Sequence, residues 1–351
     1  MLAAESKVAR AEVADSPIAD PNRSWKKIVE HVEPFLQMVG ERLTQQVHDF
    51  DPQIVPYAQY ALNGNGKHLR PTLVALAGNS VGKISDAHVT AAVIIEMVHL
   101  ATLVHDDVMD EAEIRRGQLT LAANWGNEIA VLFGDCLFAQ ALKLAASFPT
   151  PEVCRAVAMA TNTVCTGEIL QTQHRRNFEL SRREYFHVIE MKTAELFMLS
   201  CDLAAFLGDA KAGQRAALRD FGAAFGTAYQ VYDDCVDLFG SETAAGKSLG
   251  TDLAKGKLTW PVLLAWGRAN AGDRAQLEAM IESWQPENFS AVNELLAKYE
   301  TFGPSLEVIA NYLEQARKAL RILPESDGRA GLLDLTEFLA QQMDALTVCI
   351  G

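Results

Sequence analysis

The chain has 351 residues, 49% of them hydrophobic and 22% charged, with a formal net charge of −14 from 31 basic and 45 acidic residues. This composition is typical of a globular protein with a large buried core, and it excludes a disordered tail protein. The acidic balance argues against a nucleic-acid partner, because such a surface needs a basic field. An anion would have to bind through a local cluster of cations or through bound metal ions.

The cysteines and the apolar runs indicate the cellular location to expect. None of the six cysteines forms a C-x-x-C pair, so we expect reduced core thiols and no zinc site or disulfide framework. The most apolar run, 89–104, is interrupted by Glu96 and His99, and we interpret it as too short and too polar to span a bilayer. The N-terminus lacks the continuous apolar core of a signal peptide. We therefore expect a cytoplasmic protein without a transmembrane segment.

The predicted elements, taken in chain order, are helices. Residues 1–23 are small, charged and punctuated by proline, which predicts a poorly ordered tail, and helical patterning begins near Ser24. No stretch alternates as a β-strand would, and no linker divides the rest. We predict one all-α domain over 24–351, a single large bundle of about ten or more helices. After a glycine-rich loop and a helix at Pro71, the expected helices cover about 85–110, 124–147, 150–173, 182–208, 212–238, 258–270, 273–285, 289–299, 304–322 and 329–347.

Two of these helices end in the same acidic pattern, D-D-x-x-D. The first lies in "HDDVMDEAEIRRG", where Asp106 and Asp110 are four residues apart and share a helix face. The second, in "YQVYDDCVDLFG", repeats it at Asp233, Asp234 and Asp237. Mg²⁺ would offset the repulsion and would complete its shell with substrate phosphates. Two such helices facing one cavity would hold a diphosphate between them, whereas the alternative is an acidic, solvated helix end.

Basic residues accompany both motifs. Arg115 and Arg116 follow the first motif and can form forked bonds to phosphate. Glycines flank the remaining cations, and each Gly-Lys step alone is typical of an ordinary turn. Together they form a constellation suited to two separate polyphosphates. These cations are Lys67 and Arg70 in "GNGKHLRP", Lys247 and Lys257.

These segments, with "MKTAELF" and "GKSLGTDLAKGKLTWP", closely resemble the trans-isoprenyl diphosphate synthases over roughly 55–265. The resemblance implies a helical bundle around a central cavity, a homodimer, and two substrates, isopentenyl diphosphate and an allylic diphosphate. It implies that Asp106 and Asp110 bind two Mg²⁺ ions and that Asp233, with Asp237 more indirectly, binds a third. Further roles follow for sets of residues: Arg115, Lys192, Lys247 and Lys257 for the allylic diphosphate, and Lys67, Arg70, His99 and Arg116 for a metal-free pocket that holds isopentenyl diphosphate.

The implied reaction is ionisation, condensation and elimination. The metals stabilise the departing diphosphate, and oxygens of Thr193 and Gln230 stabilise the carbocation. Three departures stand out. His68 replaces the family's common arginine, which makes one phosphate contact weaker or dependent on pH, and 64–66 replace a double glycine. The C-terminal helix lacks the family's basic residues, so we assign it no site residue.

Product length depends on the residues before Asp106. Helical spacing selects Thr102, one turn earlier, while the resemblance adds Ala101 as a second position where an aromatic side chain closes the cavity in short-chain synthases. Both residues are small here, and Val98 lies a turn deeper. We therefore expect an all-trans product longer than C20, with Phe138 as a candidate lower floor.

Four alternatives stay open at this point. A short-chain farnesyl or geranylgeranyl diphosphate synthase shares the chemistry. A class I terpene cyclase needs no second diphosphate site, so the metal-free cations argue against it. A non-catalytic synthase subunit would have lost aspartates or cations that this chain keeps. A structural Ca²⁺-binding protein leaves the lysines unexplained.

Overall fold

A computed structural model describes residues 21–62, 66–241 and 249–348. The described chain is nearly all helical, which confirms the predicted fold class. The first helix begins at Pro21, ahead of the predicted start at Ser24, and residues 1–20 of the predicted tail lie outside the described part. The N-terminal helices are α1 (Pro21–Glu30), α2 (Glu33–Val47), α3 (Val55–Leu62), α4 (Leu69–Val81), α5 (Asp86–Met109), α6 (Leu121–Trp125), α7 (Asn127–Ala146) and α8 (Pro151–Gln173).

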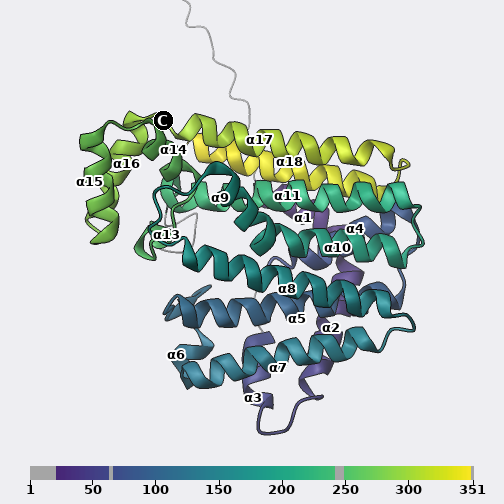
Figure 1. Ribbon diagram of the computed structural model, residues 1–351. Coiled ribbons are helices and arrows are strands. Elements are labelled where there is room, and N and C mark those ends of the chain that lie inside the picture. Colours follow the sequence, from purple (N-terminus) through teal and green to yellow (C-terminus); the bar gives the residue numbers. More distant parts are fainter. Residues whose placement is uncertain (1–20, 63–65, 242–248, 349–351) are drawn as a thin grey trace, which may run out of the picture.

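The second half of the chain builds the other side of the bundle. Helices α11, α17 and α18 run side by side along one edge, while α15 and α16 project from one end (Figure 1). These helices are α9 (Arg182–Ile189), α10 (Glu195–Leu207), α11 (Ala212–Phe239), α13 (Thr251–Ala254), α14 (Trp260–Arg268), α15 (Ala271–Glu282), α16 (Asn288–Lys298), α17 (Phe302–Ala319) and α18 (Asp327–Val348), with the short turns η1 (Glu190–Ala194) and η2 (Leu320–Ile322).

Helix α5 is a core helix that carries the first acidic motif. Ser85 and His88 form a capping box at its start, and its apolar side chains are buried against α7, α10 and α4. The helix ends at Met109, and Glu111 follows with a φ of 50°, a left-handed value that a helix cannot continue. The chain therefore turns sharply just after Asp110.

A short hairpin follows α5, which the sequence did not predict. Strands β1 (Ile114–Arg115) and β2 (Gln118–Leu119) pair antiparallel. Arg116 and Gly117 form the two-residue loop with φ values of 51° and 76°, as a type I′ turn requires. The Arg-Arg-Gly step is thus the turn of a hairpin, and its glycine has a conformational reason.

One turn between α9 and α10 is π-helical, and it is clamped from two sides. A Cβ atom added at Gly167 of α8 would lie 2.8 Å from the Lys192 nitrogen, and one at Gly226 of α11 would lie 2.8 Å from Ala194 Cα. Two helices therefore approach the backbone of η1 closely. Such turns are frequent at functional sites, and this one carries Lys192 and Thr193.

Two helices of the described chain, α5 and α7, are long and apolar enough to cross a membrane by length and composition. The prediction that the run at 89–104 is too short was wrong, because α5 has 24 residues. In its most apolar window, 61% of α5 is buried inside the protein, against 39% of α7. The apolar character of α5 is therefore accounted for by packing in the core, whereas α7 keeps an apolar exposed face.

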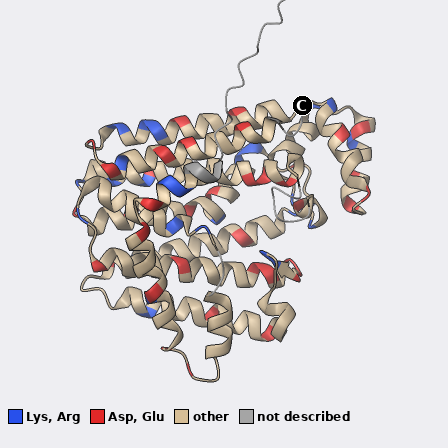
Figure 2. Cartoon of the chain, turned by 180° about the vertical axis from the view of Figure 1, so that it is seen from behind, with Lys and Arg blue, Asp and Glu red and all other residues tan. Residues whose placement is uncertain are grey.

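The distribution of charged residues and the burial of the cysteines can be compared with the expectations from the sequence. Figure 2 shows Lys and Arg interspersed with Asp and Glu along the helices. Cys201 and Cys235 are buried, as expected for core thiols, but Cys165 is exposed. It lies on α8 and lines the main cavity described below.

Candidate active site

A cavity of about 1020 Å³ brings the two acidic motifs together. Its volume is that of a site for a sizeable ligand, and its wall combines apolar and charged side chains. Of the predicted site residues, the following line it: Lys67, Arg70, His99, Thr102, Asp106, Arg115, Arg116, Phe138, Lys192, Thr193, Gln230, Asp233 and Lys257. Lys247 lies outside the described residues.

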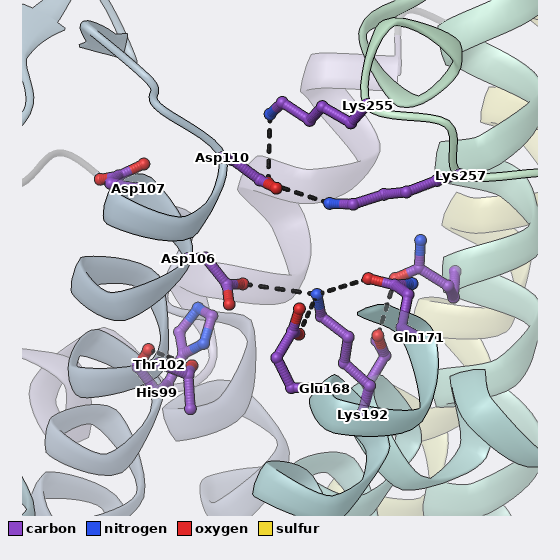
Figure 3. A network of polar contacts seen from close by, with 12 residues as sticks. His99, Thr102, Asp106, Asp107, Asp110, Glu168, Gln171, Lys192, Lys255 and Lys257 are labelled. Carbon is purple, nitrogen blue, oxygen red and sulfur yellow. Dashed lines mark hydrogen bonds and ion pairs between the residues drawn. The ribbon is translucent and has the colours of Figure 1, made fainter. Parts of the chain in front are cut away.

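The first motif is already paired with cations of the protein itself (Figure 3). Asp106 lies 3.6 Å from Lys192 Nζ. Asp107 accepts from Arg115 at 2.7 Å, and Lys257 Nζ lies 2.9 Å from Asp110. These ion pairs offset the repulsion between the carboxylates.

The two outer aspartates of the first motif differ in electrostatics. Burial raises the pKa of Asp106, and Lys192 opposes that rise only in part. Burial also acts on Asp110, but Lys257 and Lys255 outweigh it, so the pKa of Asp110 lies below its usual range. Asp110 is therefore held firmly as a carboxylate, whereas Asp106 gains most from an added cation.

Glu168 and Gln171 of α8 are site residues that the sequence reasoning missed. Lys192 Nζ donates to Gln171 Oε1 at 2.8 Å and forms an ion pair with Glu168 (Figure 3). Burial lowers the pKa of Lys192, but Asp106 and Glu168 more than offset it, so its pKa is raised. The available signal was their three-residue spacing in "GEILQ", which places both on one helix face.

The aspartates of the second motif have different surroundings. Asp233 and Asp234 line the cavity, and Asp234 accepts hydrogen bonds from Tyr185 Oη and from Gln230 Nε2. Asp237 is fully buried and does not line the cavity. Its carboxylate accepts from Thr251 Oγ1 at 2.8 Å and from the Asp252 backbone nitrogen at 3.1 Å. The prediction that Asp237 acts indirectly fits this geometry, because it organises the loop that follows the motif.

Thr193 and Gln230 form one hydrogen-bonded pair on the cavity wall. Thr193 Oγ1 donates to Gln230 Oε1 at 2.8 Å, and Gln230 Nε2 donates to Asp234 at 2.8 Å. Tyr185, which donates to Asp234 and also lines the cavity, is a further residue that spacing did not reveal.

A second cationic group lies apart from the lysines of the first motif. Arg116 at the hairpin turn reaches the glycine loop, since a Cβ at Gly66 would lie 2.8 Å from its Nη1. Arg70 Nε is buried and, within the described part of the chain, has no hydrogen-bond partner. Burial, followed by Arg70 and Arg116, lowers the pKa of His99 well below its usual value, so its imidazole is neutral. An anion would satisfy the free arginine donor.

The last helix contributes to this wall, contrary to expectation. Phe338, Leu339 and Gln342 of α18 line the cavity, and Lys67 Nζ lies 5.6 Å from the centre of the Phe338 ring. The helix was given no site residue because it lacks basic side chains. Phe338 and Leu339 contribute apolar surface and Gln342 an amide, and all three reach the cavity through helix packing, which a local sequence motif does not predict.

The apolar end of the cavity lies below the first motif. Thr102 and Phe138 line it, together with Leu43, Leu100 and Val131. Val98 and Ala101 do not line it, because they are buried in the packed core with 1% and 0% of their surface exposed. Val98 and Ala101 are thus enclosed by the core, whereas the position selected by helical spacing, Thr102, lines the cavity. Their influence on product length stays a prediction.

The carboxylates of the cavity could bind Mg²⁺ only together with phosphate groups of a substrate. Among the described residues, no three His, Cys, Asp or Glu side chains converge as a metal site. Asp106 and Asp233 face the same cavity, and carboxylate oxygens suit Mg²⁺, which usually keeps waters and takes substrate phosphates to fill its shell. The residues thus fit a metal that arrives with a diphosphate.

Comparison with known proteins identifies the class. Residues 51–299 match the family model for polyprenyl synthetase. The chain is 36% identical to an octaprenyl diphosphate synthase of Haemophilus influenzae, over 89% of this chain and 95% of the relative. A solved decaprenyl diphosphate synthase from Rhodobacter capsulatus superposes with a TM-score of 0.85 and 31% identity, covering 91% of this chain and 99% of that one.

A further solved structure carries ligands. It is a polyprenyl synthase from Caulobacter crescentus complexed with calcium and isoprenyl diphosphate, with a TM-score of 0.85 and 31% identity over 90% of this chain and 97% of that one. The chain described here belongs to the polyprenyl synthetase family, whose members are trans-prenyltransferases. Within that family it is a polyprenyl diphosphate synthase.

Proposed function

We propose that the protein uses Mg²⁺ to condense isopentenyl diphosphate with an allylic diphosphate, and that the all-trans product is longer than C20. The observation that carries this proposal is one cavity lined by two charged groups. Asp106 and Asp233 belong to one, and Arg116 with Arg70, whose buried Nε has no hydrogen-bond partner among the described residues, belongs to the other. A terpene cyclase would not need the second group.

Each group has a defined task in this proposal. Mg²⁺ held by Asp106, Asp110 and Asp233 would neutralise the charge that develops on the departing diphosphate. As the allylic carbon–oxygen bond breaks, oxygens of Thr193 and Gln230 stabilise the carbocation. The metal-free cations hold isopentenyl diphosphate while its double bond forms the new carbon–carbon bond, and the proton then leaves to the departed diphosphate.

Two observations support a long product. Thr102, a small residue one turn before Asp106, lines the cavity, and Phe138 lines it as well, with its ring centre 5.7 Å from that of His105. The octaprenyl and decaprenyl diphosphate synthases to which the chain is similar are named for long products. A short-chain synthase is the second candidate, because it would use the same charged groups.

The test is chromatography of dephosphorylated products made from farnesyl and isopentenyl diphosphates. Wild type should yield chains beyond C20, and Thr102→Phe should shorten them to C15–C20, since a ring there excludes about one aromatic side chain of volume. Thr102→Val keeps the size and should leave the length unchanged. A wild-type product that ends at C15 would establish the short-chain alternative while leaving the condensation chemistry in place.

We also propose a homodimer that packs through α7. Val131 and Leu132 of this apolar helix are 40% and 60% exposed, and burial of such side chains against another protein surface is favourable. A second copy would cover them. Light scattering should give twice the chain mass, and Leu132→Glu should reduce it to a single chain.

A further inference from the structure

Three cations converge on Asp110, the last aspartate of the first motif. Arg175 Nη2 lies 3.1 Å from one carboxylate oxygen of Asp110. Lys255 Nζ and Lys257 Nζ lie 3.1 and 2.9 Å from the other. Lys257 was predicted as a phosphate ligand, whereas Arg175 and Lys255 were not. Asp110 is therefore held from three sides by the protein itself.

The first motif is crowded with cations. Among the described residues, its ion pairs join four carboxylates with five cations. The side chains of Asp110 and Lys257 are only 10% and 11% exposed, so water screens these contacts poorly. Cations released from such contacts favour an incoming anion. The members of this set are Asp106, Asp107, Asp110 and Glu168 with Arg115, Arg175, Lys192, Lys255 and Lys257.

The position of Arg175 follows from how two loops dock. Arg175 lies just past the end of α8, and the next residue, Arg176, adopts a φ of 58°. The Arg176 backbone nitrogen donates to the Gly256 carbonyl at 2.7 Å, which ties this turn to the loop of Lys255 and Lys257. Arg175 Nε is buried and, in the part of the chain that is described, has no hydrogen-bond partner. The guanidinium thus holds Asp110 and still has a donor to offer.

We propose that Arg175 is a positioning residue that occupies Asp110 in the metal-free protein and turns to the diphosphate when Mg²⁺ takes that carboxylate. The inference rests on the function proposed above. A metal ion alone must displace Arg175 and the two lysines, and this opposes its binding. A metal ion that arrives with diphosphate supplies the anion that receives the displaced cations. Free Mg²⁺ therefore binds weakly, whereas Mg²⁺ and diphosphate bind together.

Calorimetric titration of the purified protein tests this with Mg²⁺ alone and with inorganic pyrophosphate at saturating Mg²⁺. Arg175→Ala should bind Mg²⁺ alone about three- to tenfold more tightly, because a competing charge-assisted contact is gone. The same variant should bind pyrophosphate with Mg²⁺ about tenfold more weakly. Opposite shifts of the two affinities distinguish this role from a structural one, which would weaken both.

Arg176→Ala is the matched control, since it removes the same charge one residue away. Both affinities of that variant should stay within about twofold of wild type, because Arg176 is exposed, where solvent screens its charge, and no ion pair joins it to Asp110 among the described residues. If Arg175→Ala does not fold, Lys255→Ala carries the test with the same expected tightening of Mg²⁺. Unchanged Mg²⁺ affinity in the variant that folds, or an equal change in Arg176→Ala, would overturn the proposal.

Turnover of wild type with isopentenyl and allylic diphosphates is measured alongside. Failure of wild type to condense them would reject the proposed function. Normal wild-type condensation with no shift of metal affinity in Arg175→Ala would reject only the role of Arg175.

Discussion

At the scale of single residues, the carboxylates of the two acidic motifs have different surroundings. Asp106 is buried beside Lys192, and its raised pKa shows that its charge is poorly compensated. Asp233 lines the same cavity. Asp234 and Asp237, although part of the same motif, are engaged by Tyr185 and by the loop at Thr251. The second D-D-x-x-D pattern therefore contains one candidate metal ligand, as Asp106 is in the first, and two aspartates that bind neighbouring protein groups.

The first prediction concerns those two ligands. Asp106→Ala and Asp233→Ala should each lower kcat by about a hundredfold or more, because each removes charge that holds the metals at the leaving diphosphate. Steady-state kinetics at saturating Mg²⁺ measures this, with helical circular dichroism as the check of folding. Near-normal kcat in either folded variant would contradict the assignment.

The second prediction concerns pH and His68. Its Nδ1 lies 3.6 Å from Glu96, and that partner raises the pKa of His68 above its usual 6.5, although burial and Arg116 oppose the rise. A raised pKa means that the stabilisation from the protonated pair is complete below pH 6.5 and disappears as pH rises through the folded value. The KM for isopentenyl diphosphate should rise over the same interval, because the pocket loses a positive charge.

Kinetics from about pH 6 to about pH 9 would test this. His68→Arg should keep the KM for isopentenyl diphosphate nearly constant over that range, since arginine stays charged. An equal rise in wild type and variant would assign the pH dependence to another group.

At the scale of elements, the π-helical turn η1 depends on close helix approach. A side chain at Gly226 would meet the backbone of Ala194, which cannot move without shifting Lys192 and Thr193. A Gly→Ala substitution within a helix usually stabilises it, but because of this contact we expect the substitution at Gly226 to destabilise the protein.

The third prediction compares two helical glycines. Gly226→Ala should lower the free energy of unfolding by about 1–3 kcal/mol through overpacking. Gly40→Ala in α2, where nothing lies within 4 Å of the new Cβ, should raise it by about 0.5–1 kcal/mol. Urea denaturation of both variants measures the difference, and an equal stabilisation of both would show that η1 tolerates the methyl group.

At the scale of the whole molecule, the cavity exists only because distant segments meet. The glycine loop and hairpin bring Lys67 and Arg116 to the cavity, while α5, α11 and η1 bring the aspartates and Lys192. Burial lowers the pKa of Lys67, and the charge of Asp233 opposes that effect, so the two groups share one cavity. We expect separate effects on the two substrates because the aspartates would hold one diphosphate through metal ions and the cations would hold the other directly.

The fourth prediction tests that separation. Lys67→Ala or Arg116→Ala should raise the KM for isopentenyl diphosphate about tenfold or more while changing that for the allylic substrate little, since each removes one charge-assisted contact. Initial-rate kinetics with each substrate varied gives both constants. Equal increases would show that the two groups act as one site.

Much of this protein could be predicted from its sequence. Periodicity identified α5 and α11 to within a few residues, because a continuous apolar pattern permits only a helix there. Spacing placed Asp106 and Asp110 on one face, and it selected Thr102 as a cavity residue. These are local relations, in which the backbone geometry of a few residues decides the outcome.

Only the tertiary structure decided which neighbours those residues meet. The sequence near Asp110 does not predict its contacts with Arg175 and Lys255. No motif in α18 predicts that this helix lines the cavity. Ala101 is adjacent to Thr102 yet is enclosed by the core, since neighbouring helical positions face different directions. Local patterns are set by bonds between near residues, whereas charge partners and cavity walls depend on how distant helices pack.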